Sequence, residues 1–277
     1  MINQYCDRHQ LQWDNRIHSA SLQSMVLLDY ANSGSKEFLI AYSELIPGQA
    51  IPMHCHEHSH SDFIISGHVW AQLGNRKVEL EANSATYFPA GTPHAYEAIG
   101  NETLCYYSIF PCEQKGQDVI TSPVDQSEAM KLDRPNMDKT RWAVAESFEK
   151  WMFWEPSKGI KGIQWTSLFD SERGGHDEMI VGTMIVPPGG RYSKHYHGQP
   201  EAFIGLEGRG VLFCRDEVIK VKPGVAVYVA KKQIHGAQCH GSTPFKMIWV
   251  YGTEIASTEW SWTPVEDIYL EGRPGDY

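Results

Sequence analysis

An all-β fold made of two tandem barrels is what this sequence predicts, and two observations lead to it. The second half repeats the first without a gap, and both halves consist of short strand-like segments separated by turns. Strands at this density, with no long helical periodicity between them, are typical of β-barrels and sandwiches. We therefore expect two similar barrels joined by a connector.

The repeat is recognised from a constant displacement of 141 residues, which places the pair His195/His197 over the pair His54/His56. It aligns identical residues without a gap from near Trp13 to near Phe110. The aligned identities include Trp13/Trp154, Gln23/Gln164, Asp29/Asp170, Glu37/Glu178, Pro47/Pro188, Gly48/Gly189, Gly67/Gly208, Tyr87/Tyr228 and His94/His235. Repetition over this length predicts that each half folds into the same unit.

Strands alternate with turn residues along each half. Apolar segments predict strands over 38–42, 63–65 and 106–110, and over 179–183, 203–204 and 247–251 in the second half. Turn residues separate them, because glycine, proline and asparagine adopt the backbone conformations that reverse a chain. The turns are Pro47-Gly48, Gly74-Asn75, Ala90-Gly91, Pro188-Gly189-Gly190, Pro223-Gly224 and Gly241-Ser242.

The two barrels are expected to be joined by a polar, proline-bearing segment. The sequence predicts a first barrel over 1–112, a short, partly helical connector over 113–140 and a second barrel over 141–277. Helical character is expected only in the connector and over 143–150.

Composition narrows the class of partner. The net charge is −10 and there is no run of lysine or arginine, so nucleic acid is not an expected partner. No segment approaches the roughly 18 apolar residues of a membrane span, and the N-terminus lacks the pattern of a secretory signal. The six cysteines do not map onto one another across the repeat, which favours free thiols in a reducing cytoplasm. We expect a cytoplasmic protein acting on a small molecule.

The second half contains a set of residues suited to a metal ion. Residues i and i+2 of a strand point to one face, so His195 and His197 should point together into the barrel. Glu201 follows a short turn and His235 arrives from a distant strand. Three imidazoles and a carboxylate suit a divalent ion such as Fe(II), Mn(II), Ni(II), Co(II) or Zn(II). An octahedral ion held by four such groups would keep two adjacent positions open.

This pattern resembles the first motif of the cupin superfamily, in which a glycine, His-x-His, a glutamate and a second glycine follow at fixed spacing. Gly189, His195, His197, Glu201 and Gly208 occupy these positions. The second motif of the superfamily is matched around His94 and His235, with substitutions. These are Asn83 for the opening glycine and Ala98 for the closing asparagine in the first half, and Ala230, Lys232 and Cys239 for proline, glycine and asparagine in the second. Asn83 is a mild change because asparagine tolerates positive φ.

The resemblance extends from near residue 13 to near residue 251 and implies a bicupin, two cupin barrels of the double-stranded β-helix or jelly-roll type. It also implies a divalent metal in one or both barrels, with Fe(II) the first expectation. Bicupins form dimers or larger assemblies, so the resemblance further implies a homo-oligomer.

The first half departs from the motif at one ligand position. His54, His56 and His94 fit, but His60 replaces the glutamate. His58 and Asp62 lie alongside. Three alternatives remain open here: a four-histidine site that includes His60, a three-histidine site that leaves it spare, and a site that binds no metal. His58 and His60 could also be solvated loop residues.

The loss of a carboxylate would leave a bound ion more positive and favour an anionic chelating substrate. Cupins resembling this variant include dioxygenases with three-histidine iron.

Three further residues are candidates for roles around the metal sites. Tyr96 lies two residues after His94, on the same strand face, and could act as a general acid. Arg191 and Lys194 precede the second His-x-His pair and could bind a substrate carboxylate, although loop cations are more often simply solvated.

Three functions follow. The first is a metal-dependent bicupin enzyme acting on a small polar or anionic molecule, with iron-dependent dioxygenase or oxidoreductase chemistry as the best hypothesis. The second is a redox-neutral isomerase, lyase or hydrolase using Zn, Mn or Ni. The third is a non-catalytic small-molecule binding protein.

Overall fold

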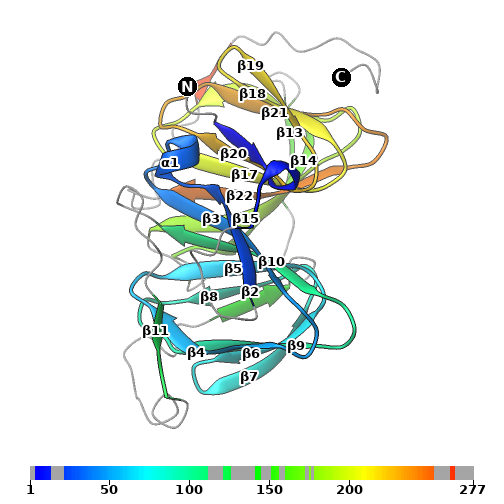
Figure 1. Cartoon of the computed structure of the whole chain (residues 1–277). Coiled ribbons are helices and arrows are strands. Elements are labelled where there is room, and N and C mark those ends of the chain that lie inside the picture. Colours follow the sequence, from blue (N-terminus) through cyan, green and yellow to red (C-terminus); the bar gives the residue numbers. More distant parts are fainter. Residues whose placement is uncertain are drawn as a thin grey trace.

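Two β-barrels, one from each half of the repeat, lie one above the other in the computed structural model of the chain (Figure 1). The structure describes residues 4–13, 22–111, 121–125, 141–144, 151–155, 160–171, 175, 178–252 and 263–265. Helical structure within these ranges is limited to α1 (Tyr30–Ser33) and the 3-10 helix η1 (Arg8–Gln10). The remaining regular elements are strands, which confirms the all-β prediction.

The first barrel is built from two antiparallel sheets that enclose an apolar core. Its strands are β2 (Leu22–Leu28), β3 (Phe38–Leu45), β4 (Ala50–His56), β5 (His60–Ser66), β6 (His68–Leu73), β7 (Arg76–Glu81), β8 (Ser84–Phe88), β9 (His94–Ile99), β10 (Leu104–Pro111), β11 (Thr121–Pro123) and β12 (Arg141–Val144). One sheet has the order β12-β8-β5-β10-β3-β2 and the other β11-β4-β9-β6-β7. Side chains of both sheets meet between them, because alternate residues of each strand point inward.

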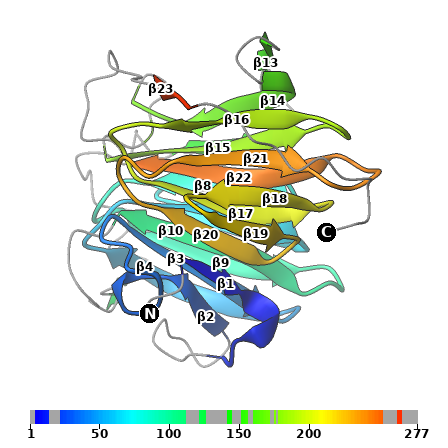
Figure 2. The same ribbon diagram turned by 90° about the horizontal axis from the view of Figure 1, so that it is seen from above.

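The strands of the second barrel are linked into one continuous twisted sheet (Figure 2). They are β13 (Trp151–Glu155), β14 (Ile160–Phe169), β15 (Met179–Val186), β16 (Arg191–Tyr196), β17 (Glu201–Glu207), β18 (Gly210–Cys214), β19 (Glu217–Val221), β20 (Val225–Val229), β21 (His235–Cys239), β22 (Phe245–Gly252) and β23 (Thr263–Pro264). The long strand β14 pairs with β15 on one side and with β16 at Lys161↔Arg191. It thereby connects the strands β20, β17, β22 and β15 to the strands β16, β21, β18 and β19.

The two halves exchange strands across the predicted boundaries. The N-terminal strand β1 (Tyr5–Asp7) pairs with β20 of the second barrel, and the Asp7 carboxylate lies 2.9 Å from Nζ of Lys222. In return, β12, which follows the predicted connector, pairs with β8 of the first barrel. The division into 1–112, 113–140 and 141–277 remains a proposal about the order of the units along the chain. Each barrel contains a strand from the other side of these boundaries, β1 in the second barrel and β12 in the first.

A single apolar cluster joins the barrels. It draws Phe38, Ile40, Phe63 and Tyr107 from the first half and Phe169, Val181, Ile204, Ile248 and Val250 from the second. At its edge the Tyr228 hydroxyl donates to Glu37 over 2.7 Å, and the Ser59 hydroxyl donates to Glu178 over 3.0 Å. Because Glu37 and Glu178 are equivalent in the repeat, each barrel uses the same residue to contact the other.

Backbone conformation explains two of the substitutions in the second cupin-like motif. Asn83 has φ of 66° and its counterpart Gly224 has φ of 89°, so the asparagine adopts the left-handed conformation as expected. Gly91 has φ of 72°, and its counterpart Lys232 keeps φ of 61° despite its side chain. The turn before His235 therefore retains its shape without glycine, at the cost of some backbone strain.

The predicted connector is only partly within the described residues. Its described part forms β11, which pairs with β4 in the register Thr121↔His56. Helical character was expected over 143–150, and this is wrong for Ala143 and Val144, which belong to β12. Residues 145–150 and the remainder of 113–140 lie outside the described residues.

Candidate metal centres

Strand ends bring the predicted ligands of the second barrel together. His195 lies near the end of β16 and is in register with His235, the first residue of β21. His197 follows β16, and Glu201 begins β17. The nitrogens that the three histidines offer lie within 4.8 Å of one another, and all three side chains are buried.

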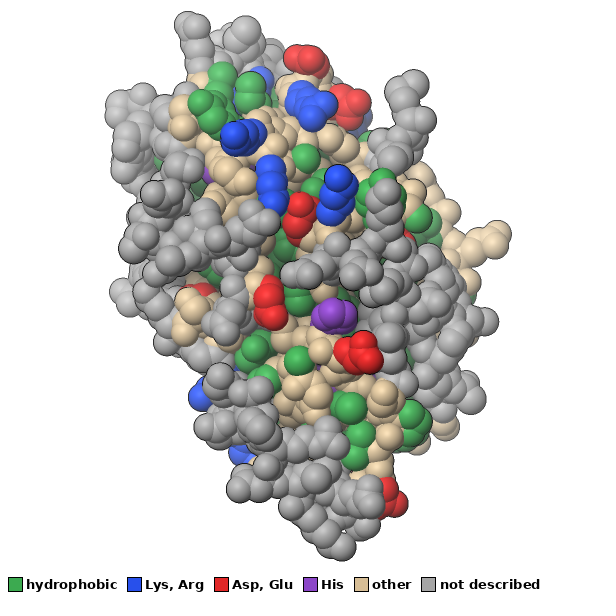
Figure 3. Space-filling view, turned by 90° about the vertical axis from the view of Figure 1, so that its left-hand side faces the viewer, with side chains coloured by type: hydrophobic (Ala, Val, Ile, Leu, Met, Phe, Trp, Pro, Cys, Tyr) green, Lys and Arg blue, Asp and Glu red, His purple; other side chains and the backbone are tan. Residues whose placement is uncertain are grey.

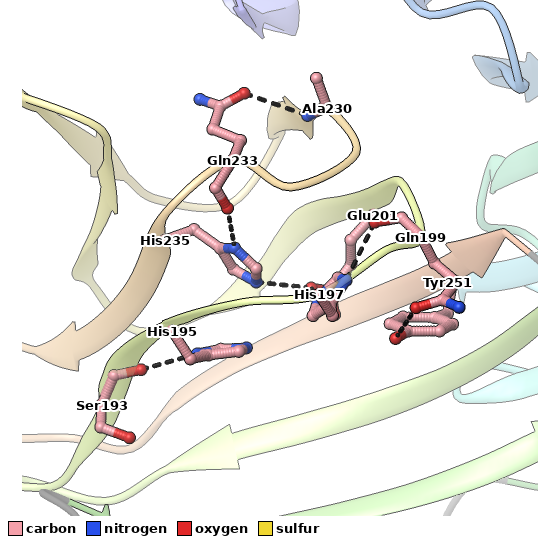
Figure 4. A network of polar contacts seen from close by, with 9 residues as sticks. All are labelled: Ser193, His195, His197, Gln199, Glu201, Ala230, Gln233, His235 and Tyr251. Carbon is pink, nitrogen blue, oxygen red and sulfur yellow. Dashed lines mark hydrogen bonds and ion pairs between the residues drawn. The ribbon is translucent and has the colours of Figure 1, made fainter. Parts of the chain in front are cut away.

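Main-chain carbonyl groups fix the orientation of each imidazole in this group (Figure 4). Nδ1 of His195 donates to the carbonyl of Ser193 over 2.7 Å, Nδ1 of His197 to Gln199 over 2.9 Å and Nδ1 of His235 to Gln233 over 2.8 Å. A neutral imidazole that donates through Nδ1 carries its lone pair on Nε2. The three rings therefore present Nε2 lone pairs for metal binding.

The carboxylate of Glu201 completes the group. Its Oε2 lies 2.9 Å from Nε2 of His235 and 3.2 Å from Nε2 of His197. Two acceptors at this separation attract each other only if a proton or a cation lies between them. Burial tends to raise the pKa of Glu201, but its contacts with His197 and His235 outweigh it and lower the pKa to about 2. The residues therefore fit a divalent ion held by three imidazoles and a carboxylate.

The first barrel has an equivalent triad. His54, His56 and His94 offer nitrogens within 4.8 Å of one another. Nδ1 of His54 donates to the carbonyl of Pro52 over 2.7 Å, and Nδ1 of His94 donates to Thr92 over 2.9 Å. Pro52 and Thr92 are the counterparts of Ser193 and Gln233, so the same carbonyl positions orient histidines in both barrels.

Burial makes these imidazoles suitable ligands. Desolvation lowers the pKa of His54, and it lowers the pKa of His94 further, where the neighbouring imidazoles add to it. In the second barrel, desolvation followed by the neighbouring His235 places the pKa of His195 well below its ordinary value. Neutral imidazole is the form that binds metal.

His60 is the counterpart of Glu201 in the repeat, but it does not join the first triad as Glu201 joins the second. Neither of its nitrogens belongs to the cluster formed by the first triad. Its ring stacks on Phe88 and on Phe110, with ring centroids 4.8 Å apart in each case, and its Nε2 lies 3.8 Å from Oδ2 of Asp62. His60 is buried, so the alternative that it is a solvated loop residue is wrong, whereas His58 is exposed. The arrangement favours a three-histidine site with His60 beside it.

The structure places the other candidate residues away from a metal-facing position. The Tyr96 hydroxyl donates to Asp62 over 2.8 Å and lies 2.8 Å from the Thr86 hydroxyl, inside the barrel core. Nζ of Lys194 lies 4.8 Å from the centroid of the Phe213 ring. Because Phe213 alternates with the inward-facing Cys214, this contact is on the outside of the barrel.

The other predicted cation, Arg191, begins β16 at the end of the strand away from the ligands. It is in register with Lys161 on one side and Gln238 on the other. The role of either cation in substrate binding remains a proposal.

Sequence reasoning missed residues that support the second triad. Tyr251 packs on His197, with ring centroids 4.7 Å apart, and its hydroxyl donates to the side chain of Gln199 over 2.7 Å. Gln233 exchanges amide hydrogen bonds of 3.0 and 2.8 Å with Gln4, so the N-terminal segment contacts the turn that carries His235. The displacement of 141 offers a signal for Tyr251, because its counterpart is Phe110.

The model of the cupin domain matches residues 41–110 and again residues 182–251, together just over half of the chain. The chain belongs to the cupin family. The two matched ranges are themselves displaced by 141 residues, which confirms that the repeat consists of two cupin domains and that the protein is a bicupin.

Two curated relatives of this chain are enzymes by their names. The chain is 24% identical over 220 residues to quercetin 2,3-dioxygenase from Bacillus subtilis, covering 68% of this chain and 65% of that enzyme. It is 28% identical over 97 residues to dimethylsulfoniopropionate lyase DddW from Ruegeria pomeroyi, covering 35% of this chain and 62% of the lyase. The chain thus spans less than two thirds of the length of either relative.

Solved structures show the same fold at low sequence identity. The oxalate decarboxylase of Lactobacillus farciminis, in a formate complex, matches with a TM-score of 0.70 and 14% identity, covering 92% of this chain and 87% of its own. The protein Ylba from E. coli matches with a TM-score of 0.66 and 15% identity over 91% of both chains. These matches establish the bicupin architecture for this chain.

On the face shown in Figure 3, lysine and arginine side chains gather toward the second-barrel end, with acidic side chains between them, and no continuous basic stripe crosses the described part of that face. No helix among the described residues is both long and apolar enough to span a bilayer. Five of the cysteines are described and all of these are free thiols; Cys112 lies outside the described residues.

Proposed function

We propose that this bicupin is a metal-dependent enzyme that acts on a small polar or anionic molecule, with iron-dependent dioxygenase or oxidoreductase chemistry. The observation that carries the proposal is the pair of histidine triads, in each of which the nitrogens lie within 4.8 Å of one another; His54 is partly buried and the other five imidazoles are buried. The similarity to quercetin 2,3-dioxygenase supports dioxygenase chemistry in particular. The homo-oligomeric state and the cytoplasmic location suggested by the sequence remain part of this proposal.

The protein groups would divide the work as follows. His54, His56 and His94 would hold one divalent ion, and His195, His197, His235 and Glu201 a second. When bound, such an ion supplies a Lewis acid with open positions for a chelating substrate.

The two sites would differ in net charge. Glu201 would neutralise half the charge of its ion, whereas the described first triad has no carboxylate among its grouped ligands. An ion in the first barrel would therefore attract an anionic chelator more strongly. The rings of Phe88 and Phe110, which stack around His60 beside this triad, would restrict access of water.

Metal analysis combined with oxygen uptake tests this proposal. We expect elemental analysis of the isolated protein to give two divalent ions per chain, and the Fe(II)-loaded protein to consume oxygen with an anionic, chelating enol or hydroxyketone. An isolated protein that contains no bound metal would contradict the proposed metal sites. Metal binding without oxygen consumption for any member of that substrate class would contradict the dioxygenase assignment alone.

A redox-neutral reaction is the second candidate, because the chain is also 28% identical over 97 residues to a lyase. In that case Zn, Mn, Ni or Co would be the active metal, and the ion would stabilise an enolate while a protein group moves a proton. Activity of the Zn- or Ni-loaded protein in the absence of oxygen would select this candidate. Ligand binding without turnover under any metal would instead identify a non-catalytic binding protein.

A further inference from the structure

The interior of the first barrel contains a set of buried polar side chains. Asp62 lies at its centre: Oδ1 accepts a hydrogen bond of 2.6 Å from the Ser108 hydroxyl, and Oδ2 accepts one of 2.8 Å from the Tyr96 hydroxyl. The Thr86 hydroxyl lies 2.8 Å from the Tyr96 oxygen. Further polar side chains lie in the same interior. The full set consists of Ser24, Ser43, Asp62, Thr86, Tyr96, Tyr106 and Ser108, all less than 9% exposed.

The second barrel has apolar side chains at every one of these positions. The displacement of 141 residues replaces Asp62 by Phe203, Thr86 by Val227 and Tyr96 by Ala237. The complete set of counterparts is Trp165, Met184, Phe203, Val227, Ala237, Met247 and Trp249, all of which belong to or pack against the core cluster of the second barrel. The same fold therefore forms with an apolar interior, and the polar set is not a requirement of the architecture.

Burying this polar set is energetically unfavourable compared with the apolar alternative. A buried carboxylate loses its hydration, and hydrogen bonds from neighbouring hydroxyl groups recover only part of that loss. Burial of Asp62 raises its pKa to about 6, even though Ser108 and Tyr96 act in the opposite direction. A polar network that the fold does not need, and that costs stability, indicates a role in function.

The network reaches the first metal centre through His60. Nε2 of His60 lies 3.8 Å from Oδ2 of Asp62, while its ring lies 4.8 Å from the rings of both His56 and His94. At this distance the Asp62 carboxylate is not hydrogen-bonded to Nε2, but its charge favours the tautomer with a proton on that nitrogen. The stacked rings of Phe88 and Phe110 limit rotation of the imidazole. In the second barrel the equivalent Glu201 contacts the triad directly, and Phe203 offers no polar group behind it.

We infer that the reaction takes place in the first barrel and that Asp62 is a positioning residue there, which holds the His60 imidazole beside a three-histidine metal centre. This inference rests on the proposed function, because it assigns that chemistry to one of the two sites. The second barrel then holds its ion with Glu201 as a ligand, next to a core that is apolar at the positions equivalent to the polar set. The role of Asp62 is exerted through His60 and requires no direct contact with the metal.

Nitric oxide binding to Fe(II) tests the inference without knowledge of the substrate. The substitutions His195→Ala and His235→Ala remove the second centre, so that the electron paramagnetic resonance spectrum of the Fe(II)–nitric oxide complex reports only the first. In this background we expect Asp62→Asn to change the rhombicity of the spectrum and to weaken nitric oxide binding by up to roughly 10-fold. This is the lower end of the roughly 10- to 100-fold loss of metal affinity or activity found when a partner of a metal ligand is removed, because His60 is not itself a ligand. Asp62→Leu, which imitates the apolar second barrel, should do the same.

Phe203→Leu in the same background is the matched control, because it alters the equivalent position of the other barrel. We expect it to leave the spectrum and the nitric oxide affinity unchanged. Unchanged spectra in both Asp62 variants would overturn the inference, as would an equal change in Phe203→Leu or a background protein that binds no iron. Thermal unfolding identifies a variant that fails to fold, and Asp62→Asn, which keeps an acceptor for the hydroxyl groups, then carries the test. Absence of oxygen consumption by the Fe(II)-loaded parent protein with an anionic, chelating enol or hydroxyketone would instead refute the dioxygenase assignment of the proposed function.

Discussion

Asp62 makes the stability of the metal-free protein depend on pH in a direction that can be worked out. Its pKa rises from an ordinary value of 3.8 to about 6 in the folded protein, because burial penalises the charged form. A carboxyl group whose pKa is higher in the folded state binds its proton more tightly there. Its contribution to stability is therefore fully present below about pH 4 and is lost as the pH rises through 6.

The size of this effect follows from the same two pKa values. A shift of one pKa unit between the unfolded and folded states corresponds to a free energy of about 1.4 kcal/mol. The rise in the pKa of Asp62 from 3.8 to about 6 therefore corresponds to roughly 3 kcal/mol. Asp62→Asn removes the titrating group and retains a side chain of similar shape. We expect the free energy of unfolding of this variant, relative to the parent, to rise by an amount of this order between pH 4 and pH 8.

Urea unfolding at a series of pH values, with a chelator present and tryptophan fluorescence as the signal, measures this difference. The chelator is needed because a cation in the first triad would stabilise the charged carboxylate. Other titrating groups are common to both proteins and cancel in the comparison, and any loss of hydrogen bonding adds a constant offset. A difference that stays flat across the range, or one that changes with the opposite sign, would refute the reasoning.

Further predictions concern the metal sites and the packing around them. His54→Ala and His195→Ala should each lower the metal content by one divalent ion per chain in elemental analysis. If only one of these two variants loses metal, a single barrel binds metal. Tyr251→Phe, which copies the first barrel, should lower the free energy of unfolding by about 1 kcal/mol, the value of one hydrogen bond, as measured by urea unfolding. Gly208→Ala should lower the thermal midpoint much more than Gly189→Ala: both glycines have positive φ (68° and 71°), but only the first would press a Cβ atom into a neighbouring main-chain carbonyl.

Much of the fold and the ligand set could be predicted from the repeat. A constant displacement over a whole unit implies that the two units share every strand and turn, so identifying His195 and His235 also located His54 and His94. The tolerance of Asn83 for positive φ was predicted from its side chain alone. These features are local, or repeat a local pattern, and local patterns are what a sequence displays directly.

The exchange of strands and the orientation of His60 could not be predicted in this way. Pairing of β1 with β20 depends on which sheet edge is free and near, and that is a property of the assembled barrels. The spacing of His60 is compatible with a ligand, yet its ring lies between aromatic neighbours with Nε2 toward Asp62. Such an orientation is set by packing among strands that are distant in sequence.

The sequence by itself therefore determined the duplication, the all-β class and the two sets of candidate ligands, because residue type and spacing follow from covalent order. Only the tertiary structure decided how these side chains are used: which nitrogens converge, which carbonyl groups orient them, and that one barrel encloses a polar network where the other encloses an apolar core. The physical reason is that metal binding and the effects of burial depend on distances and on the surrounding dielectric, and both arise when strands far apart along the chain come together.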